Sequence, residues 1–180
     1  MSVDIIHILG ASGSGTTTLA QELEQKYDYK WLDTDHYFWF PTEPPFTISR
    51  PREKRISLMA ASIEENSKCV ISGSLCGWGD VFIPEFELVI FIYTTSDIRK
   101  ERLKKREYQR YGERIRKGGD MYEEHIKFIN WAMAYDTSDV NMRSLKLHEE
   151  WLKQLTCPVI RLNGADTSKQ HLNQLEKYLM

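Results

Sequence analysis

The sequence has no long hydrophobic run. No apolar segment approaches the roughly 18 residues that a membrane-spanning helix needs. The N-terminus also has no basic segment followed by a long apolar one, because Asp4 interrupts the first hydrophobic stretch. From these absences we expect a cytoplasmic protein that does not associate with a membrane.

Cysteine and net charge are also low. The three cysteines, Cys69, Cys76 and Cys157, follow no metal-ligand or Cys-x-x-Cys spacing, so we expect reduced thiols without a metal or redox role. The net charge of the 180 residues is -2, which argues against a nucleic-acid partner. The length suits a single domain over residues 1–180.

A glycine-rich segment stands directly after an apolar run near the N-terminus. It matches the phosphate-binding loop pattern G-x-x-x-x-G-K-[ST] at both glycines and at the hydroxyl position. Glycines let backbone N–H groups turn toward an anion, and the helix that follows presents its N-terminal dipole to the same charge. The predicted phosphate contacts are Gly10, Ser12, Gly13, Ser14, Gly15, Thr16, Thr17 and Thr18.

The flanking residues favour the structural context that this motif needs. Val3–Leu9 is short, apolar and β-branched, which predicts a buried strand, whereas Leu19, Leu23 and Tyr27 recur at helical spacing. The order strand, glycine-rich loop, helix is the one in which such a loop binds phosphate. One position departs from the pattern, because Thr16 stands where lysine is expected. The change removes the point charge that meets the β- and γ-phosphates of a nucleotide.

Acidic residues follow the short strand that is predicted to end at Asp33. The segment reads Asp33-Thr34-Asp35, and ligands gather at the carboxyl ends of parallel strands. Carboxylates there can bind Mg²⁺ or accept a hydroxyl proton. We therefore take Asp33 and Asp35 as candidate catalytic residues, with Asp33 and Thr17 as candidate magnesium ligands. An ordinary turn is the alternative, since Asp and Thr are common turn residues.

Two further segments are candidates for an acceptor site. The aromatic- and proline-rich residues 36–51 exclude a regular helix or a central strand, and they suit either the edge of a core or the wall of a substrate pocket. The strand predicted at Cys69–Gly73 ends in a glycine-rich turn, which allows a ligand to approach the backbone closely. A tight turn is the alternative for the glycines of this segment. For Arg52, at the start of the predicted helix before this strand, a solvated helix face is the alternative. The candidate acceptor contacts are Arg52, Gly73, Gly77 and Gly79.

A cluster of basic residues follows the continuously apolar strand predicted at Leu88–Tyr93. Arg102, Arg106 and Arg110 repeat every four residues, which places them on one face of the predicted helix. The glycine-flanked residues 107–121 have the composition of a mobile lid, and a basic lid would suit a phosphate loop. A solvated helix face is the alternative. Salt-dependent nucleic-acid binding is another, which the net acidic charge disfavours.

The remaining segments complete an alternation of strands and helices. Helices are predicted at Arg52–Ser67, Met121–Tyr135, Arg143–Leu155 and Ser168–Leu179, and a fifth strand at Pro158–Leu162. No internal repeat, linker or low-complexity segment interrupts the chain. The predicted fold class is α/β, with a five-stranded parallel sheet, helices on both faces and a short basic lid.

This arrangement resembles the small P-loop kinases of nucleotides and metabolites, such as adenylate kinase, shikimate kinase and gluconate kinase. The resemblance covers nearly the whole chain and is carried by Gly10–Thr18, Asp33–Asp35 and Glu101–Arg106. It implies a three-layer P-loop NTPase fold with strand order 2-3-1-4-5. It also implies ATP over the phosphate loop, Mg²⁺ as cofactor, and a small-molecule acceptor between Asp33, the helix from Arg52 and the glycine-rich turn.

The resemblance further implies roles for individual residues. In adenylate kinases the first arginine of the pattern at Glu101–Arg106 stacks on adenine and the second reaches the phosphates, which assigns these roles to Arg102 and Arg106. Arg143 loosely matches a further phosphate contact. One departure concerns the third strand, which ends in Ser72-Gly73-Ser74 and not in an aspartate that could hold magnesium through water.

Three functions follow from these residues. The first is ATP-dependent phosphoryl transfer to a nucleoside, nucleotide or small metabolite, with Arg106 and Arg110 replacing the missing lysine. The second is a catalytically silent nucleotide-binding module that acts through a protein partner. The third uses Ser14–Thr17, whose sequence Ser-Gly-Thr-Thr resembles the element with which sulfotransferases hold the 5′-phosphate of their donor. The aspartate pair and the basic segment fit that last class poorly.

Overall fold

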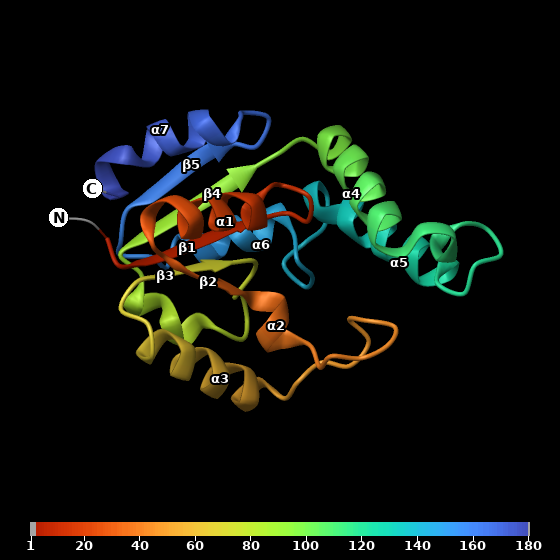
Figure 1. The fold of residues 1–180 in the computed structure, drawn as a ribbon, viewed down its shortest axis with the longest axis horizontal. Coiled ribbons are helices and arrows are strands. Elements are labelled where there is room, and N and C mark those ends of the chain that lie inside the picture. The colour runs from red at the N-terminus through yellow and green to blue at the C-terminus, as the bar shows by residue number, and fades with distance from the viewer. Residues whose placement is uncertain (1–2, 180) are drawn as a thin grey trace.

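A central parallel sheet organises the computed structural model, which describes residues 3–179 (Figure 1). The strands are β1 (Ile5–Gly10), β2 (Lys30–Asp33), β3 (Cys69–Ser72), β4 (Leu88–Tyr93) and β5 (Val159–Asn163). They pair in the order β2-β3-β1-β4-β5, and every adjacent pair is parallel. Ile8 lies opposite Ser72 on one side and Ile90 on the other. The predicted fold class and strand order are confirmed.

Helices connect the strands and cover both faces of the sheet. They are α1 (Thr16–Tyr27), α2 (Thr34–Phe38), α3 (Arg52–Glu64), α4 (Ser96–Tyr111), α5 (Tyr122–Met133), α6 (Leu145–Leu152) and α7 (Ser168–Leu179), with 3₁₀ turns η1 (Asp80–Glu85), η2 (Gly112–Ile115) and η3 (Ala134–Asp136). The helices α1 and α7 pack on one face, and α3, η1 and α6 pack on the other. Helices α4 and α5 extend beyond the carboxyl ends of the strands (Figure 1). Within residues 3–179, no helix is both long and apolar enough to cross a bilayer.

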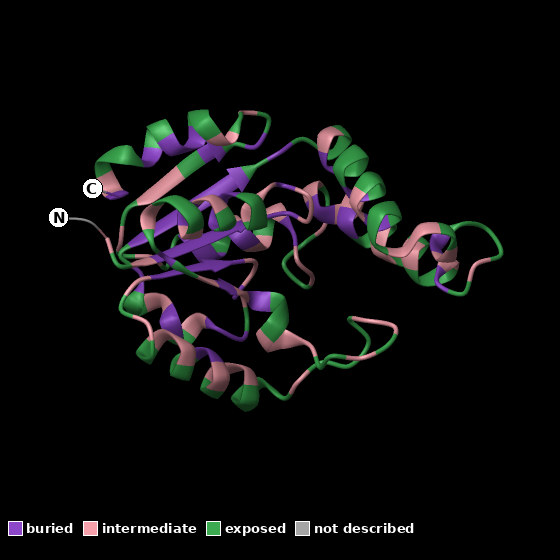
Figure 2. Cartoon of the chain, viewed as in Figure 1, coloured by how far each residue is buried: buried purple, intermediate pink, exposed green. Residues whose placement is uncertain are grey.

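Alternating strand residues fill a separate core on each face of the sheet. Ile6 and Ile8 of β1 pack with Leu23 of α1, whereas Leu9 packs with Met59 of α3 on the opposite face. Because both faces are covered, the central strands are buried over most of their length (Figure 2). This is why these strands read as nearly continuous apolar runs, with His7 of β1 as a buried exception.

Two segments differ from the sequence expectations. Helix α2 runs through Phe38 into residues 36–51, for which no regular helix was predicted. Asp33 starts this helix, because its Oδ1 accepts a hydrogen bond from the Asp35 N–H at 3.0 Å. Helix α4 continues to Tyr111, so residues 107–111 of the predicted lid are regular helix.

Candidate functional site

The phosphate loop turns sharply between β1 and α1. Gly13 and Gly15 have φ angles of 82° and 108°, which are left-handed values that favour glycine. A Cβ on Gly10 would lie 2.5 Å from Ser14 Oγ, so a larger residue does not fit there. Helix α1 begins at Thr16, immediately after these turns. The glycines therefore account for the turns of the loop.

Side chains from later in the chain hold the loop in place. Thr94, which follows β4, donates its hydroxyl proton to the Ser14 carbonyl at 3.1 Å. Arg102 of α4 donates to the Gly13 and Ser14 carbonyls at 3.4 and 3.3 Å. The same guanidinium donates to the Gly164 carbonyl, after β5, at 2.8 Å. Arg102 thus joins three segments through their backbone, and its stacking on adenine stays a prediction.

A cavity of about 490 Å³ lies over the loop at the carboxyl edge of the sheet. The phosphate loop, the start of α2, the end of β3, helix α4 and the turn after β5 contribute to its wall. The predicted site residues that line it are Ser12, Gly13, Ser14, Gly15, Thr16, Thr17, Thr18, Asp33, Asp35, Gly73, Arg102, Arg106 and Arg110. The structure therefore brings the phosphate loop, the aspartate pair and the arginine series of α4 together.

Four predicted residues do not line this cavity. Gly10 is buried at the end of β1, and Arg52 is exposed at the start of α3. Gly77 is exposed in the turn after β3. Gly79 packs on Leu75, where a Cβ would come within 2.7 Å of that side chain. Gly79 thus serves chain packing, Gly77 lies at the surface, and Gly73 alone of these three glycines lines the cavity.

The aromatic residues of 36–51 pack on one another and on arginines. Phe38 lies 6.2 Å from the ring of Trp78 and beneath the guanidinium carbon of Arg55, which is 3.6 Å from the ring centroid. The rings of Trp39 and Phe46 meet edge to face at 6.2 Å. None of these residues lines the cavity. The edge-of-core alternative therefore describes this segment, because its side chains are already engaged there.

The aspartate pair faces the cavity in two different environments. Asp33 is partly buried, whereas Asp35 is exposed. Burial raises the pKa of Asp33 and the charge of Asp35 raises it further, while the Asp35 N–H and Arg110 oppose the shift. A cation beside Asp33 would relieve this repulsion between carboxylates. The pair is therefore suited to hold a positive charge next to the phosphate loop.

Magnesium fits these residues. Among residues 3–179, no group of three or more His, Cys, Asp or Glu side chains forms a metal cluster. Mg²⁺ does not need one, since it binds through one or two protein oxygens and completes its shell with phosphate oxygens and waters. Thr17 and Asp33 both line the cavity and present such oxygens.

The structure adds cavity residues that the motifs did not identify. Arg143, which only a loose resemblance had suggested, donates from Nη2 to the Gly10 carbonyl at 2.8 Å. Its contact partner is 133 residues away, so no local spacing could reveal it. The far end of the cavity is lined by Gly164, Asp166, Ser168 and His171. The only sequence signal for that turn was its place after a predicted parallel strand.

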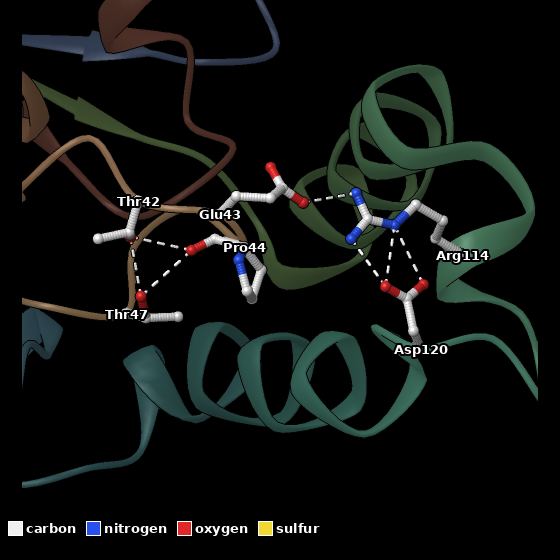
Figure 3. A network of polar contacts seen from close by, with 6 residues as sticks. All are labelled: Thr42, Glu43, Pro44, Thr47, Arg114 and Asp120. Carbon is white, nitrogen blue, oxygen red and sulfur yellow. Dashed lines mark hydrogen bonds and ion pairs between the residues drawn. The ribbon is translucent and has the colours of Figure 1, made fainter.

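An ion-pair network joins the loop after α2 to the segment after α4 (Figure 3). Arg114 of η2 contacts Glu43 and Asp120, each at 2.7 Å. The hydroxyls of Thr42 and Thr47 lie 2.8 Å apart, and both donate to the Pro44 carbonyl. We refer to these six residues as the rim network. Glu43 and Arg114 thus connect the loop after α2 to the segment predicted as a lid.

A phosphate loop after the first strand of a 2-3-1-4-5 parallel sheet defines a P-loop kinase-like fold. Residues 6–127 match the model of a family described as an AAA domain, and the chain belongs to this family. The uncharacterized protein YqaC of Bacillus subtilis (strain 168) is 40% identical over 174 residues, which are 97% of this chain and 96% of YqaC.

Several solved kinase structures share the fold. A shikimate kinase from Bacteroides thetaiotaomicron matches with a TM-score of 0.59 and 19% identity, over 98% of this chain and 99% of that one. A shikimate kinase from Acinetobacter baumannii in complex with shikimate matches with a TM-score of 0.54 and 14% identity. The match covers 97% of this chain and 94% of that one. A sugar kinase from Janibacter sp. HTCC2649 matches with a TM-score of 0.53 and 17% identity. The match covers 98% of this chain and 94% of that one. At these identities the likeness shows the fold alone.

Proposed function

We propose that this protein transfers the terminal phosphoryl group of ATP to a hydroxyl of a small polar acceptor. The supporting observation is the single cavity into which the phosphate loop, the aspartate pair and the arginine series open. Phosphoryl transfer depends mainly on positioning and on neutralising phosphate charge, and these three groups suit both tasks.

Each group has a separate role in this proposal. Backbone N–H groups of the loop 10–18 hold the phosphates, and Arg102 lies at the adenine side. Thr17 and Asp33 hold Mg²⁺, which supplies positive charge to the phosphates when bound. Asp35 accepts the proton of the acceptor hydroxyl, whose oxygen forms the new bond to phosphorus as the bond to ADP breaks.

The α4 arginines supply charge where the loop has none. Arg106 and Arg110 line the cavity one helical turn apart, on the face predicted from their spacing. Closure of residues 107–121 over the cavity, together with the end of α4 that carries both arginines, would bring them nearer to the phosphates and exclude water. In this proposal the protein is competent only when this segment is closed.

The chemistry of the cavity wall favours a polar acceptor. Beside Asp33 and Asp35, the wall carries Gly73 and the cations Arg110 and Arg143. The tryptophans and phenylalanines of residues 36–51 are engaged elsewhere. A hydroxyl near the carboxylates and an anionic group near the arginines would match this wall, as in a hydroxy acid or a monophosphate.

The test is ATP turnover with a panel of small hydroxyl and monophosphate acceptors. Turnover is measured by the release of ADP and by mass analysis of the product. Asp35→Asn should lower kcat by about 10²–10⁴-fold, because a positioned base is lost, and should leave the Kd for ATP nearly unchanged. Asp97→Asn, on the exposed start of α4, is the matched control. Absence of a phosphorylated product with every acceptor would overturn the proposal.

Thr16 favours a second candidate, a nucleotide-binding module without catalysis. A lysine ammonium contributes on the order of 4 kcal/mol at about 4 Å and an effective dielectric of 20, and a threonine hydroxyl supplies no such charge. Under this alternative, ATP raises the melting temperature with or without Mg²⁺, no transfer occurs, and Thr16→Lys creates turnover. Tighter binding of adenosine bisphosphate than of ATP would support the sulfotransferase-like site.

A further inference from the structure

Arg143, which only loosely matches a phosphate contact of the related kinases, lines the cavity from the segment before α6. Its Nη2 donates to the Gly10 carbonyl at 2.8 Å. The side chain also borders Ser12 of the phosphate loop and the ring of Trp131, whose centroid is 6.0 Å from the guanidinium carbon. The guanidinium therefore lies beside the first residues of the phosphate loop, on the same cavity as Thr16.

The charge of Arg143 has no close carboxylate partner. It forms no salt bridge with any residue in the range 3–179. Its Nε is buried and has no hydrogen-bond partner within the same range. Burial lowers the pKa of Arg143, while Asp35 and Asp33 act at longer range to stabilise its charge. A partly desolvated cation of this kind attracts an anion more strongly than one in water.

The other arginines of the cavity are placed differently. Arg102 donates to three backbone carbonyls, and Arg106 pairs with Glu107 at 3.1 Å. Arg110 is exposed at the outer end of α4. Among the described cavity arginines, only Arg143 combines a buried nitrogen that has no hydrogen-bond partner with a contact to the Gly10 carbonyl at the start of the phosphate loop.

We propose that Arg143 supplies, from the segment before α6, the positive charge that Thr16 leaves out of the phosphate loop. Its guanidinium binds the terminal phosphates of the nucleotide, and it is in place before the arginines of α4 close over them. This rests on the proposed function, because it assumes that the cavity binds a nucleotide. The loop lysine is thus replaced by an arginine from a distant part of the chain.

A buried hydrogen-bonded chain lies close to Arg143. His148 Nδ1 lies 2.8 Å from the Tyr135 hydroxyl, and its Nε2 lies 3.2 Å from Ser74 Oγ. Burial and the neighbouring Arg143 charge lower the pKa of His148 to about 3. The imidazole is therefore neutral at physiological pH and adds no like charge beside the guanidinium. This arrangement preserves the positive charge of Arg143 for an anion in the cavity.

The experiment compares phosphate-chain binding in matched variants. Titration calorimetry of the full chain with MgATP and with inorganic tripolyphosphate is run on the wild type, Arg143→Met, Arg143→Lys, Thr16→Lys and the double variant Thr16→Lys/Arg143→Met. Arg161→Met is the control, because Arg161 pairs with Glu149 at 2.7 Å on the surface of β5 and does not line the cavity. Melting temperatures identify any variant that does not fold.

Loss of one charge-assisted contact should weaken tripolyphosphate binding by about 10- to 100-fold in Arg143→Met. Arg143→Lys should lose less, and Arg161→Met should match the wild type. Thr16→Lys should strengthen binding less with Arg143 present than without it, and should restore most of the loss in the double variant. If Arg143→Met does not fold, the difference between Arg143→Lys and wild type, and its rescue in an added double variant Thr16→Lys/Arg143→Lys, decide the question.

The outcomes separate the two proposals. If the wild type binds ATP and transfers its phosphoryl group, but removal of Arg143 does not weaken tripolyphosphate binding, the role of Arg143 is wrong and the kinase activity stands. The role of Arg143 is also wrong if Thr16→Lys strengthens binding equally with and without Arg143. If the wild type binds neither ATP nor tripolyphosphate, both proposals are overturned.

Discussion

The inner wall of the cavity and its outer rim are built in different ways. The inner wall, formed by the phosphate loop 10–18 and the end of β3, has glycines without space for a side chain and is held by buried hydrogen bonds such as Thr94 to Ser14. The rim network consists mainly of exposed charged and polar groups. Exposed ion pairs contribute little to stability in water. The part that would hold phosphates is therefore fixed by the fold, whereas the part that covers them can separate at low cost.

Removal of the buried arginine behind the wall should have the largest effect. Arg99 is fully buried, donates to the Thr94 and Ala132 carbonyls at 3.0 and 2.9 Å, and pairs with Asp136. Arg99→Met should lower the free energy of unfolding by about 3–5 kcal/mol, because these partners lose their donor. The exposed pair of Arg161 is the control, and its loss should cost about 0–1 kcal/mol in urea unfolding. Equal losses of unfolding free energy in the two variants would contradict the difference between the buried wall and the exposed surface.

A methyl group added at the cavity wall should lower the free energy of unfolding more than a methyl group added away from the cavity. Gly73 and Gly77 both have positive φ angles, 114° and 79°. A Cβ on Gly73 would overlap Thr34 Oγ1, whereas a Cβ on Gly77 would meet nothing within 4 Å. Gly73→Ala should therefore be about 1–3 kcal/mol less stable than Gly77→Ala in urea unfolding. Because strain at positive φ is common to both, their difference isolates the steric overlap.

Two buried histidines should make stability depend on pH. Burial lowers the pKa of His7 to about 4, and burial with the Arg143 charge lowers that of His148 to about 3. The unfolded chain binds protons at these sites from about pH 6.5 downward, before the folded protein does. The free energy of unfolding should thus fall as pH falls below about 6.5, by about 1.4 kcal/mol per pH unit for each histidine. His148→Gln should reduce this slope in urea titrations, and an unchanged slope would rule out the neutral imidazole.

The smallest effect on stability is expected at the rim. Arg114→Gln should leave the unfolding midpoint unchanged within error and should speed amide exchange in residues 40–48, because the contact with Glu43 is lost. Arg116→Gln is the matched control, since Arg116 pairs with Glu113 on its own turn. Exchange that rises equally in both variants, or in neither, would mean that the rim network does not connect the two segments.

Local patterns in the sequence predicted much of the sheet and the phosphate loop. The loop 10–18 depends on its own glycines, and the register of Arg102, Arg106 and Arg110 depends on helical periodicity alone. Both are short-range properties, so spacing is enough to predict them. The strand order came from the resemblance to P-loop kinases and not from the residues themselves.

Such local patterns could not predict contacts between residues that are far apart in the sequence. The contact of Arg143 with Gly10 and that of Arg114 with Glu43 each need the folded chain. Arg52 is exposed at the start of α3 and lies outside the cavity, although its residue type suited an anionic acceptor. Residue type and spacing alone could not distinguish this arginine from Arg143.

The presence of threonine at position 16 has a consequence for chemical labelling. Among the described residues that line the cavity, none is a lysine, so the site has no primary amine. Acylating nucleotide analogues need such an amine, and a guanidinium stays protonated and does not react in its place. A survey that finds nucleotide sites by acylation of a loop lysine would therefore pass over this protein, even with ATP bound. Acetylation would likewise have no target inside this cavity.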